Sequence, residues 1–385
     1  MVSRTGEFAV RAGTALALFG AATTLLNRIT VRQLRTAPAP VDEVVTVCVP
    51  ARDEADRLPR LIADLRAQRG ISDLGVLILD DASADGTEAA ALAAIGDDER
   101  FTVVRTDIAP PPGWTGKNAA CARLAELAGQ DFGILIFLDA DVRLTPGALA
   151  AAVTELRRGR AGLVCAWPRQ EAGSALERLV QPLLAWSWAA TLPLPLGNRS
   201  LRPSTAVACG QFLVFDAAAY AGIGGHAAVA DRITEDLALA RVLRRAGTRT
   251  ELVAGGQVAR TRMYRGAREL DAGYTRWLWS AYGGAAGSAA IGLYTALAYW
   301  GPPLAALLGR GRVRRVGLLG YAAAVTGRLL ARSTETGGPP TRADALAALA
   351  HPISAAAYLG LSARSHLAHS RGRLSWKGRA LGDAH

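Results

Sequence analysis

The chain has 385 residues, of which half are hydrophobic and 20% are charged, and its formal net charge is +11. A mean hydropathy of +0.17 is high for a purely soluble enzyme and indicates contact with a membrane. The basic residues are almost all arginines, and they concentrate beside apolar segments, which argues against nucleic acid and favours anionic lipid or phosphate partners. The four cysteines lie far apart with no C-x-x-C pair, so we expect neither zinc nor a disulfide framework.

Residues 8–27 form an apolar segment with arginines on both sides. Its uncharged core, 12–26, is short for a bilayer span of about 20 residues, and no convincing small-residue cleavage site precedes the arginines that follow. We therefore expect a membrane anchor or an interfacial helix rather than a signal peptide. The more basic carboxyl flank places the following domain in the cytoplasm, and residues 1–41 are interpreted as this anchor and its linker.

From Val44 onwards, short β-branched runs alternate with amphipathic stretches. This alternation predicts an α/β fold, a mostly parallel sheet with helices on both faces. The predicted strands are 44–49, 75–79, 101–105, 134–138, 162–166, 212–215 and 250–254. The predicted helices are 53–68, 84–95, 115–128, 145–158, 174–192 and 234–245.

The helix expected at 174–192 is apolar all round and carries Trp186 and Trp188, which fits either a membrane interface or a core helix. After Gly283 the composition is that of membrane segments, with candidates at 287–308, 316–330 and 345–362. A basic tail on the cytoplasmic side requires an even number of crossings, so we expect the proline-broken first segment to be re-entrant. The expected domains are 1–41, a catalytic domain at 42–282, and membrane segments with a tail at 283–385.

Two aspartates, Asp139 and Asp141, end the apolar run 134–138. Alternate residues of an extended segment point the same way, so both carboxylates can face one ligand. Close carboxylates repel each other unless a cation lies between them, and hard divalent cations prefer oxygen ligands. An isolated D-x-D is also typical of an exposed acidic turn, so the neighbouring motifs have to decide between these interpretations.

Polar motifs follow each of the first three predicted strands: P-A-R-D-E at 50–54, D-D-A-S at 80–83 with D-G-T at 85–87, and P-G-W-T-G-K-N at 112–118. Together with the aspartate pair they surround one carboxyl edge of a parallel sheet, which makes that edge a candidate nucleotide site. A Walker A loop is excluded because Pro111 and Asn118 stand where it needs glycine and Ser/Thr. Lys117, at a helix start, is placed to meet a phosphate.

In this order and spacing, V-x-V-x-V-P-A-R-D-E, L-D-D-A-S-A-D-G-T, G-W-T-G-K-N and L-D-A-D-V closely resemble the family 2 glycosyltransferases of the GT-A fold. The resemblance covers about residues 44–279. P-P-G-W-T-G-K is similar to the hopanoid-associated members, and R-M-Y-R-G followed by G-Y-T-R-W is similar to the 4,4'-diaponeurosporenoate (carotenoid) glycosyltransferases.

The resemblance implies roles for the motif residues. The residues implied in nucleotide-sugar binding are Pro50, Asp53, Glu54, Asp81, Lys117 and Asp139, with Asp53, Glu54 and Asp81 on the base and ribose. Asp139 and Asp141 would hold a divalent metal, Mg²⁺ or Mn²⁺, on the diphosphate, Asp141 more directly. The family's catalytic base lies on an E-D pair, here Glu235-Asp236, and we expect Asp236 to act, with Glu235 second. Carboxylates are also favoured at a helix amino terminus for its dipole alone.

Processive polysaccharide synthases carry Q-x-x-R-W, whereas this chain has Gly273 where the glutamine would stand. That departure favours a single transfer over polymerisation. Trp114, Arg276 and Trp277 are expected to border the acceptor side of the site, although an interfacial anchor explains Arg276 and Trp277 equally well.

The sequence thus predicts an inverting glycosyltransferase of the cell membrane, with its catalytic domain facing the cytoplasm. We expect it to move a hexose, glucose from UDP-glucose, onto a lipid or isoprenoid acceptor such as a carotenoid or a hopanoid, with no nucleic acid partner. A polysaccharide synthase or a polyprenyl-phosphate sugar transferase is the alternative within the same class. A non-catalytic membrane binding protein on the same scaffold is the alternative from another class.

Overall fold

The computed structural model describes residues 4–129, 133–376 and 379–380. The chain divides into two compact units, each assembled from separate stretches of sequence. One consists of Met1–Val31, Ala172–Pro195 and Tyr264–Ser375, and the other consists of Arg32–Glu171, Leu196–Met263 and Trp376–His385. We call the first the helical unit and the second the sheet unit.

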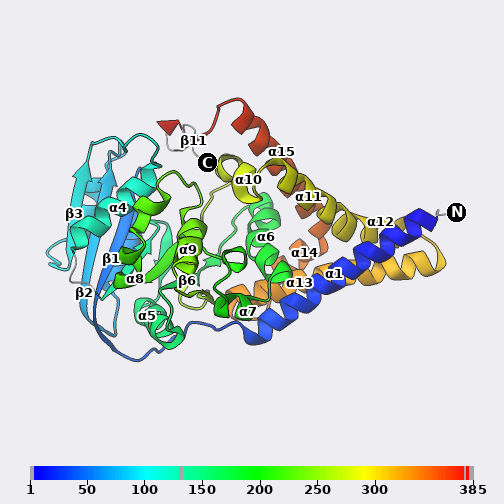
Figure 1. Ribbon diagram of the computed structural model, residues 1–385, viewed down its shortest axis with the longest axis horizontal. Helices are drawn as coiled ribbons and strands as arrows, with labels where there is room; N and C mark the ends of the chain where they lie inside the picture. The colour runs from blue at the N-terminus through cyan, green and yellow to red at the C-terminus, as the bar shows by residue number, and fades with distance from the viewer. Residues whose placement is uncertain (1–3, 130–132, 377–378, 381–385) are drawn as a thin grey trace. The chain divides into compact units, whose positions relative to one another are not determined.

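The sheet unit is built on a seven-stranded sheet with the strand order β3-β2-β1-β4-β8-β6-β9 (Figure 1). All neighbouring strands are parallel except β8, which is antiparallel to both β4 and β6. The mostly parallel α/β sheet expected from the sequence is therefore confirmed. The strands are β1 (Val41–Ala51), β2 (Ile71–Asp81), β3 (Phe101–Thr106), β4 (Ile134–Leu138), β6 (Leu163–Trp167), β8 (Phe212–Asp216) and β9 (Thr250–Ala254).

Strand β4 lies in the middle of this sheet, and every one of its residues is buried. An apolar run of this kind is what a strand covered on both faces requires. The covering helices include α2 (Leu58–Arg66), α3 (Thr87–Ile95), α4 (Gly116–Ala128), α5 (Ala148–Gly159), α8 (Ala217–Gly222) and α9 (Glu235–Arg245). Because β4 is fixed from both sides, the residues that follow it have a defined position.

Helix α2 begins at Leu58, five residues later than the expected start at Asp53. Asp53 has a φ of 50°, in the left-handed region, which is incompatible with an α-helical start. The chain from Asp53 to Ala55 directs its backbone N–H groups to side chains of the loop after β2 instead of to helical carbonyls. The predicted helix boundary was wrong because long-range hydrogen bonds replaced local ones.

A second sheet of three short strands was not predicted from the sequence. It has the order β5-β10-β7, formed by Val142–Leu144, Ala259–Thr261 and Arg169–Gln170. Strands of two or three residues are too short to show the period-2 pattern on which such a prediction depends. Strand β5 follows Asp141 directly and pairs antiparallel with β10, so this sheet fixes the chain just beyond the aspartate pair.

In the helical unit, α1 (Arg4–Thr30) lies along α13 (Gly311–Thr336), as Figure 1 shows. The helices approach closely where both carry small residues: a Cβ on Gly320 would lie 2.6 Å from the hydroxyl of Thr14, and one on Gly327 would lie 3.3 Å from the Ala21 backbone. The unit's other helices are α6 (Ala175–Thr191), α10 (Ala267–Ala281), α11 (Ala285–Thr295), α12 (Gly301–Leu308), α14 (Arg342–Leu349) and α15 (His351–Ser370).

Within the described residues, two helical stretches are long and apolar enough to cross a membrane, Arg4–Thr30 and Ala285–Leu308, and a third counts if α14 and α15 form one span. The sharp bend, of 71°, lies between α14 and α15. By contrast, Pro302 and Pro303 stand in the first turn of α12, after a π-helical stretch at Ala296–Trp300. The predicted segment 316–330 lies inside α13, which is not among the candidates. The number of crossings, the orientation and the domain boundaries stay predictions.

Candidate active site

The aspartate pair lies at the carboxyl end of β4, where the chain makes a tight turn into β5. The backbone N–H of Asp139 donates to the carbonyl of Gln211 at 3.1 Å, and Val142 N–H donates back to the carbonyl of Asp139 at 3.1 Å. The first bond ties the turn to the start of β8. The two carboxylates therefore stand on a short, internally bonded loop rather than on a free acidic turn.

Asp141 is half-buried, and its Oδ1 atom is buried without a hydrogen-bond partner within the described part of the chain. Burial raises the pKa of Asp141 to about 7, and the nearby charges of Asp139 and Glu54 add to that rise. An orphaned carboxylate oxygen beside other carboxylates is the donor set that a divalent cation satisfies. In the residues described, no three His, Cys, Asp or Glu side chains are placed to hold a metal ion by themselves, so the remaining ligand positions would go to water or diphosphate.

Lys117 joins the aspartate pair to the start of α9. Its Nζ atom lies 2.8 Å from Asp139 Oδ1 and 2.8 Å from Glu235 Oε1. Burial opposes the charge on this amine, but Asp139 and Glu235 outweigh that effect and hold the pKa of Lys117 well above its usual range. Three segments that are far apart in sequence thus meet at one protonated lysine.

The segment before α9 is held in place by the W-T-G-K-N motif. The side-chain amide of Asn118 donates to the carbonyls of Val229 at 2.8 Å, Ala230 at 3.0 Å and Arg232 at 3.0 Å, so one of its two hydrogens is shared. Thr115 donates its backbone N–H to Ala230 at 2.8 Å and also caps α4 through its side chain, as predicted. Sequence reasoning missed this role of Asn118, because its partners are backbone carbonyls about a hundred residues away.

The two carboxylates at the start of α9 differ in their surroundings. Glu235 is 6% exposed and ion-paired with Lys117. Asp236 is half-buried, its Oδ1 accepts the Leu237 N–H at 2.7 Å, and burial together with the charge of Glu235 raises the pKa of Asp236 to about 6. Of the two, Asp236 is the one with no ion pair among the described residues, and its raised pKa makes it a stronger base than an exposed aspartate.

Gly210 is a second residue that sequence reasoning missed. A Cβ at this position would lie 3.3 Å from both Asp236 Oδ2 and Glu235 Oε1. Any larger side chain there would press on both carboxylates. Its neighbour Gln211 bonds to the aspartate turn, so the start of β8 contacts both carboxylate groups of the site. The sequence C-G-Q before β8 carries no motif that would have revealed this.

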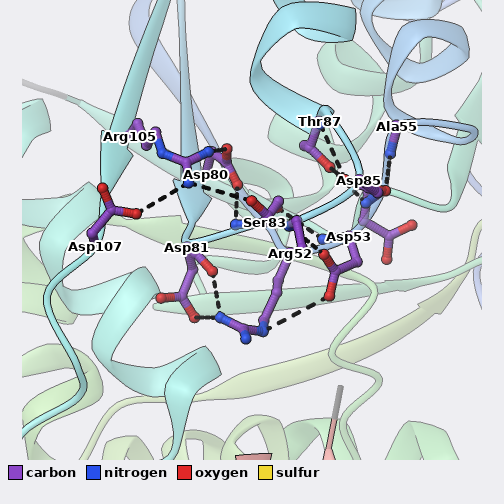
Figure 2. A network of polar contacts seen from close by, with 12 residues as sticks. Arg52, Asp53, Ala55, Asp80, Asp81, Ser83, Asp85, Thr87, Arg105 and Asp107 are labelled. Carbon is purple, nitrogen blue, oxygen red and sulfur yellow. Dashed lines mark hydrogen bonds and ion pairs between the residues drawn. The ribbon is translucent and has the colours of Figure 1, made fainter. Parts of the chain in front are cut away.

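The loops after β1 and β2 are joined by reciprocal hydrogen bonds, which Figure 2 shows. Asp53 N–H donates to Ser83 Oγ at 2.9 Å, while Ala84 N–H donates to Asp53 Oδ1 at 2.9 Å. Farther along, Ala55 N–H donates to Asp85 Oδ2 at 3.0 Å. The two loops therefore form one rigid surface at the carboxyl edge of β1 and β2.

Arginines complete this surface. Arg52 donates to the carbonyl of Asp81 at 2.6 Å, and its guanidinium lies 4.0 Å from the carboxylates of Asp81 and Asp53 (Figure 2). Asp80, 1% exposed, is held by Arg105 at 2.9 Å and by the backbone N–H of Ser83 at 3.1 Å, which makes it a structural anchor.

The remaining predicted residues lie in different surroundings. Pro50 is in β1 opposite Leu79, and Glu54 pairs with Arg57 at 3.2 Å. Trp114 is half-buried in the turn before α4, whereas Arg276 and Trp277 lie on α10 of the helical unit. The expectation that these last three residues border the acceptor stays a prediction.

Comparisons with known proteins bear on this geometry. Residues 46–224 match the family model described as Glycosyl transferase family 2. The chain is 28% identical over 237 residues to the 4,4'-diaponeurosporenoate glycosyltransferase of Staphylococcus haemolyticus, in an alignment that covers 61% of this chain and 60% of that relative. Its fold is similar to that of mannosyltransferase PcManGT from Pyrobaculum calidifontis in complex with GDP-Man and Mn²⁺, with a TM-score of 0.55, 19% identity and coverage of 93% of this chain and 98% of that chain.

Proposed function

We propose that the chain, whose residues 46–224 match the Glycosyl transferase family 2 model, transfers a hexose from a nucleotide-sugar to a lipid acceptor. The observation that carries the proposal is the meeting of Asp139, Lys117 and Glu235 at one sheet edge, with Asp141 and Asp236 beside them. At that edge Asp139, Asp141 and Lys117 are available for the donor diphosphate, and Asp236 is available to accept the acceptor's proton.

The donor side of the site is the joined pair of loops after β1 and β2. Asp53, Glu54 and Asp81 would bind the base and ribose, with Pro50 beneath them in β1. The hydrogen bonds between the loops support this role, because they fix the carboxylates before the donor arrives, which lowers the cost of binding. The similar PcManGT was solved with GDP-Man, which favours a nucleotide-sugar donor here; UDP-glucose is our choice.

Asp139 and Asp141 would hold Mg²⁺ or Mn²⁺ against the donor diphosphate. When bound, such an ion stabilises the negative charge that develops on the leaving diphosphate. Lys117 adds a fixed positive charge beside Asp139. The orphaned Oδ1 of Asp141 supports the assignment, since an ion there would satisfy a buried oxygen that otherwise has no partner.

Asp236 would act as the general base. The acceptor hydroxyl or acid gives its proton to the Asp236 carboxylate while its oxygen forms a bond to the anomeric carbon. The bond from that carbon to the diphosphate oxygen breaks, and the nucleoside diphosphate leaves from the opposite face with inversion. A pKa of about 6 leaves Asp236 mostly ionised at neutral pH, yet more basic than an exposed aspartate.

A lipid acceptor is favoured by two observations. Helices Arg4–Thr30 and Ala285–Leu308 are long and apolar enough to cross a membrane, and the curated relative is named for 4,4'-diaponeurosporenoate, a carotenoid. A carotenoid or hopanoid acceptor would reach the site from the cell membrane, with the sheet unit in the cytoplasm.

The proposal is tested by incubating the purified full chain in detergent with radiolabelled UDP-glucose, Mn²⁺ and lipid extracted from host membranes. We expect one labelled lipid glycoside with the unmodified chain and none with Asp141→Asn or Asp236→Asn. Asp73→Asn, which changes an exposed carboxylate on β2, is the matched control and should keep full activity.

Each other outcome contradicts a part of the proposal. A labelled polymer would identify a polysaccharide synthase, and a labelled sugar phosphate lipid would identify a polyprenyl-phosphate sugar transferase. Donor binding without any transfer, over a full panel of lipids and nucleotide-sugars, would identify a non-catalytic binding protein.

A further inference from the structure

The helical unit contains a pocket of about 320 Å³, and its lining includes Arg276, which the sequence predicts to border the acceptor. Its walls come from α10, from the end of α15 and from the turn that follows α15. Four arginines line it, together with a single carboxylate: Arg276, Arg364, Arg371, Arg373 and Asp271. The lining therefore has a clear excess of positive charge.

Only one of these arginines has a carboxylate partner in the ranges the structure describes. The guanidinium of Arg364 lies 2.7 Å from Asp271 Oδ2, in an exposed pair. Arg276, Arg371 and Arg373 have no ion pair there, although they share a cavity in which like charges repel. An anion in the pocket would relieve that repulsion.

The pocket is built on fixed walls. Ser365 Oγ accepts the backbone N–H of Trp279 at 2.9 Å and donates to the carbonyl of Thr275 at 2.6 Å, which locks α15 to α10. The rings of Trp279 and His369 stack at 3.6 Å, with 5° between their planes. These contacts hold the two helices together directly beside the arginines.

The turn after α15 brings its arginines back over the pocket. Gly372 has a φ of 61°, which a residue with a Cβ rarely adopts, and it reverses the chain. Arg373 N–H then donates to the carbonyl of Ala368 at 3.0 Å. If the chain continued in an extended form, Arg373 would lie away from the pocket. The reversal therefore keeps Arg373 in the pocket lining.

The pocket lining also includes one residue with a neutral hydroxyl. Thr275 lines it, and the Thr275 hydroxyl oxygen is buried with no hydrogen-bond partner in the described residues. Buried hydroxyls nearly always have a partner, so this one points to a missing ligand atom. Guanidinium groups with a hydroxyl are the donor set that binds phosphate oxygens.

We propose that this pocket binds the phosphate group of an anionic membrane lipid. The lipid source is favoured by the position of the pocket at the end of α15, which with α14 forms an apolar pair that composition allows to cross a membrane. Leu367, 49% exposed, lies on the lining and offers the lipid's glycerol and acyl chains an apolar contact. Arginines at such a helix end lie at the depth of lipid phosphates.

The test uses the full chain in an uncharged detergent, titrated with dioctanoyl phosphatidylglycerol, dioctanoyl phosphatidylcholine or inorganic phosphate, with the thermal unfolding temperature as readout. We expect phosphatidylglycerol to bind about tenfold or more tightly than either other probe. The double variant Arg371→Glu/Arg373→Glu should lose at least about tenfold in affinity for it.

Arg312→Glu/Arg314→Glu is the matched control, because it makes the same charge change at exposed residues of α13 in the same unit, outside the pocket. It should keep the affinity of the unmodified chain. If the glutamate double variant fails to fold, Arg371→Gln/Arg373→Gln takes its place. Equal binding of the two lipids, equal loss in the control, or no loss in the pocket variant would each overturn the proposal. Equally tight binding of inorganic phosphate would overturn the lipid assignment.

Discussion

In the joined loops after β1 and β2, Asp53, Asp80 and Asp85 each accept hydrogen bonds from backbone N–H groups or arginine. Around Lys117 the situation is reversed. Asp139 and Glu235 pair with this lysine, and the pKa values of their neighbours Asp141 and Asp236 are raised because burial and nearby carboxylates disfavour their charge.

This difference separates residues that build the site from residues that are available for chemistry. A carboxylate whose oxygens are fully used contributes to folding, whereas one with an orphaned oxygen or a raised pKa stores unfavourable energy that a ligand or proton can release. Replacing a carboxylate by its amide should therefore have opposite consequences in the two regions. At Asp141 and Asp236 it should cost activity, and at the buried loop anchor Asp80 it should cost stability.

Asp236→Asn should have the largest effect. We expect the rate of transfer to fall by about 10² to 10⁴, the usual contribution of a general base, with no loss of stability. In the unmodified chain the rate should rise with pH through about 6, since the pKa of Asp236 is raised to about 6 and only the ionised form accepts a proton. Initial rates between pH 5 and 8 measure both. A variant with full activity, or a flat pH profile, would refute the assignment.

Asp141→Asn should remove the response to metal. Without the charge of Asp141, we expect the affinity for Mn²⁺ to fall by about a hundredfold, on the scale of lost metal-site interactions. The melting temperature measures this, because Mn²⁺ at a hundredfold its dissociation constant adds about 2.7 kcal/mol of stability to the unmodified chain. Asp73→Asn serves again as the control. If Mn²⁺ stabilises Asp141→Asn as strongly as the unmodified chain, the metal lies elsewhere.

Asp80→Asn should show the opposite pattern. It removes the charge of a buried group that Arg105 and the Ser83 N–H both contact, and we expect a loss of about 1–3 kcal/mol in the free energy of unfolding. Asp107→Asn is a close control, since Asp107 contacts the same arginine at 3.1 Å but is 73% exposed. It should cost less than about 1 kcal/mol. If the two variants lose equal stability, the burial of Asp80 and its bond to Ser83 add nothing to the contact with Arg105.

The sequence predicted what depends on local pattern. The alternation of strands and helices, the aspartates at the end of β4 and the Thr115 cap all follow from short-range periodicity or side-chain chemistry, and the structure has each of them. The likeness to family 2 glycosyltransferases came from motifs in a fixed order, and residues 46–224 match the model of that family. The meeting of the motif residues at one sheet edge was expected because ligands bind at the carboxyl ends of parallel strands.

What the sequence missed depends on partners far along the chain. Asn118 was considered in a phosphate-loop pattern and in the G-W-T-G-K-N family motif, and neither indicates that its partners are carbonyls at 229–232. Gly210 matters because two carboxylates of α9 approach it. The start of α2 moved because Asp53 adopts a left-handed conformation and bonds to the neighbouring loop. No local propensity reports any of these contacts.

The helical unit contains its own satisfied polar group, Arg328, which lies within the apolar stretch 316–330. It is 2% exposed, and its guanidinium donates to the carbonyls of Arg178 at 3.1 Å and Leu179 at 2.9 Å. Both carbonyls belong to the turn of α6 that Pro182 disrupts, because proline has no N–H for the carbonyl four residues before it. Arg328 therefore supplies the hydrogen bond to the Arg178 carbonyl that the proline removes, and it donates to the neighbouring Leu179 carbonyl as well.

A double-mutant cycle tests this compensation, and its effect should be the smallest of the four. Arg328→Met should lower the free energy of unfolding by about 1–3 kcal/mol by leaving the carbonyls unpaired. In the Pro182→Ala background the helix regains its own N–H, so the same change should cost about 1 kcal/mol less. Arg312→Met, at an exposed position of the same helix, should show no coupling to Pro182. Zero coupling for Arg328 as well would mean that the arginine is retained for another reason. In that case, a polar side chain with all its hydrogen bonds made would identify a stabilising residue in the loops after β1 and β2 but not in the helical unit.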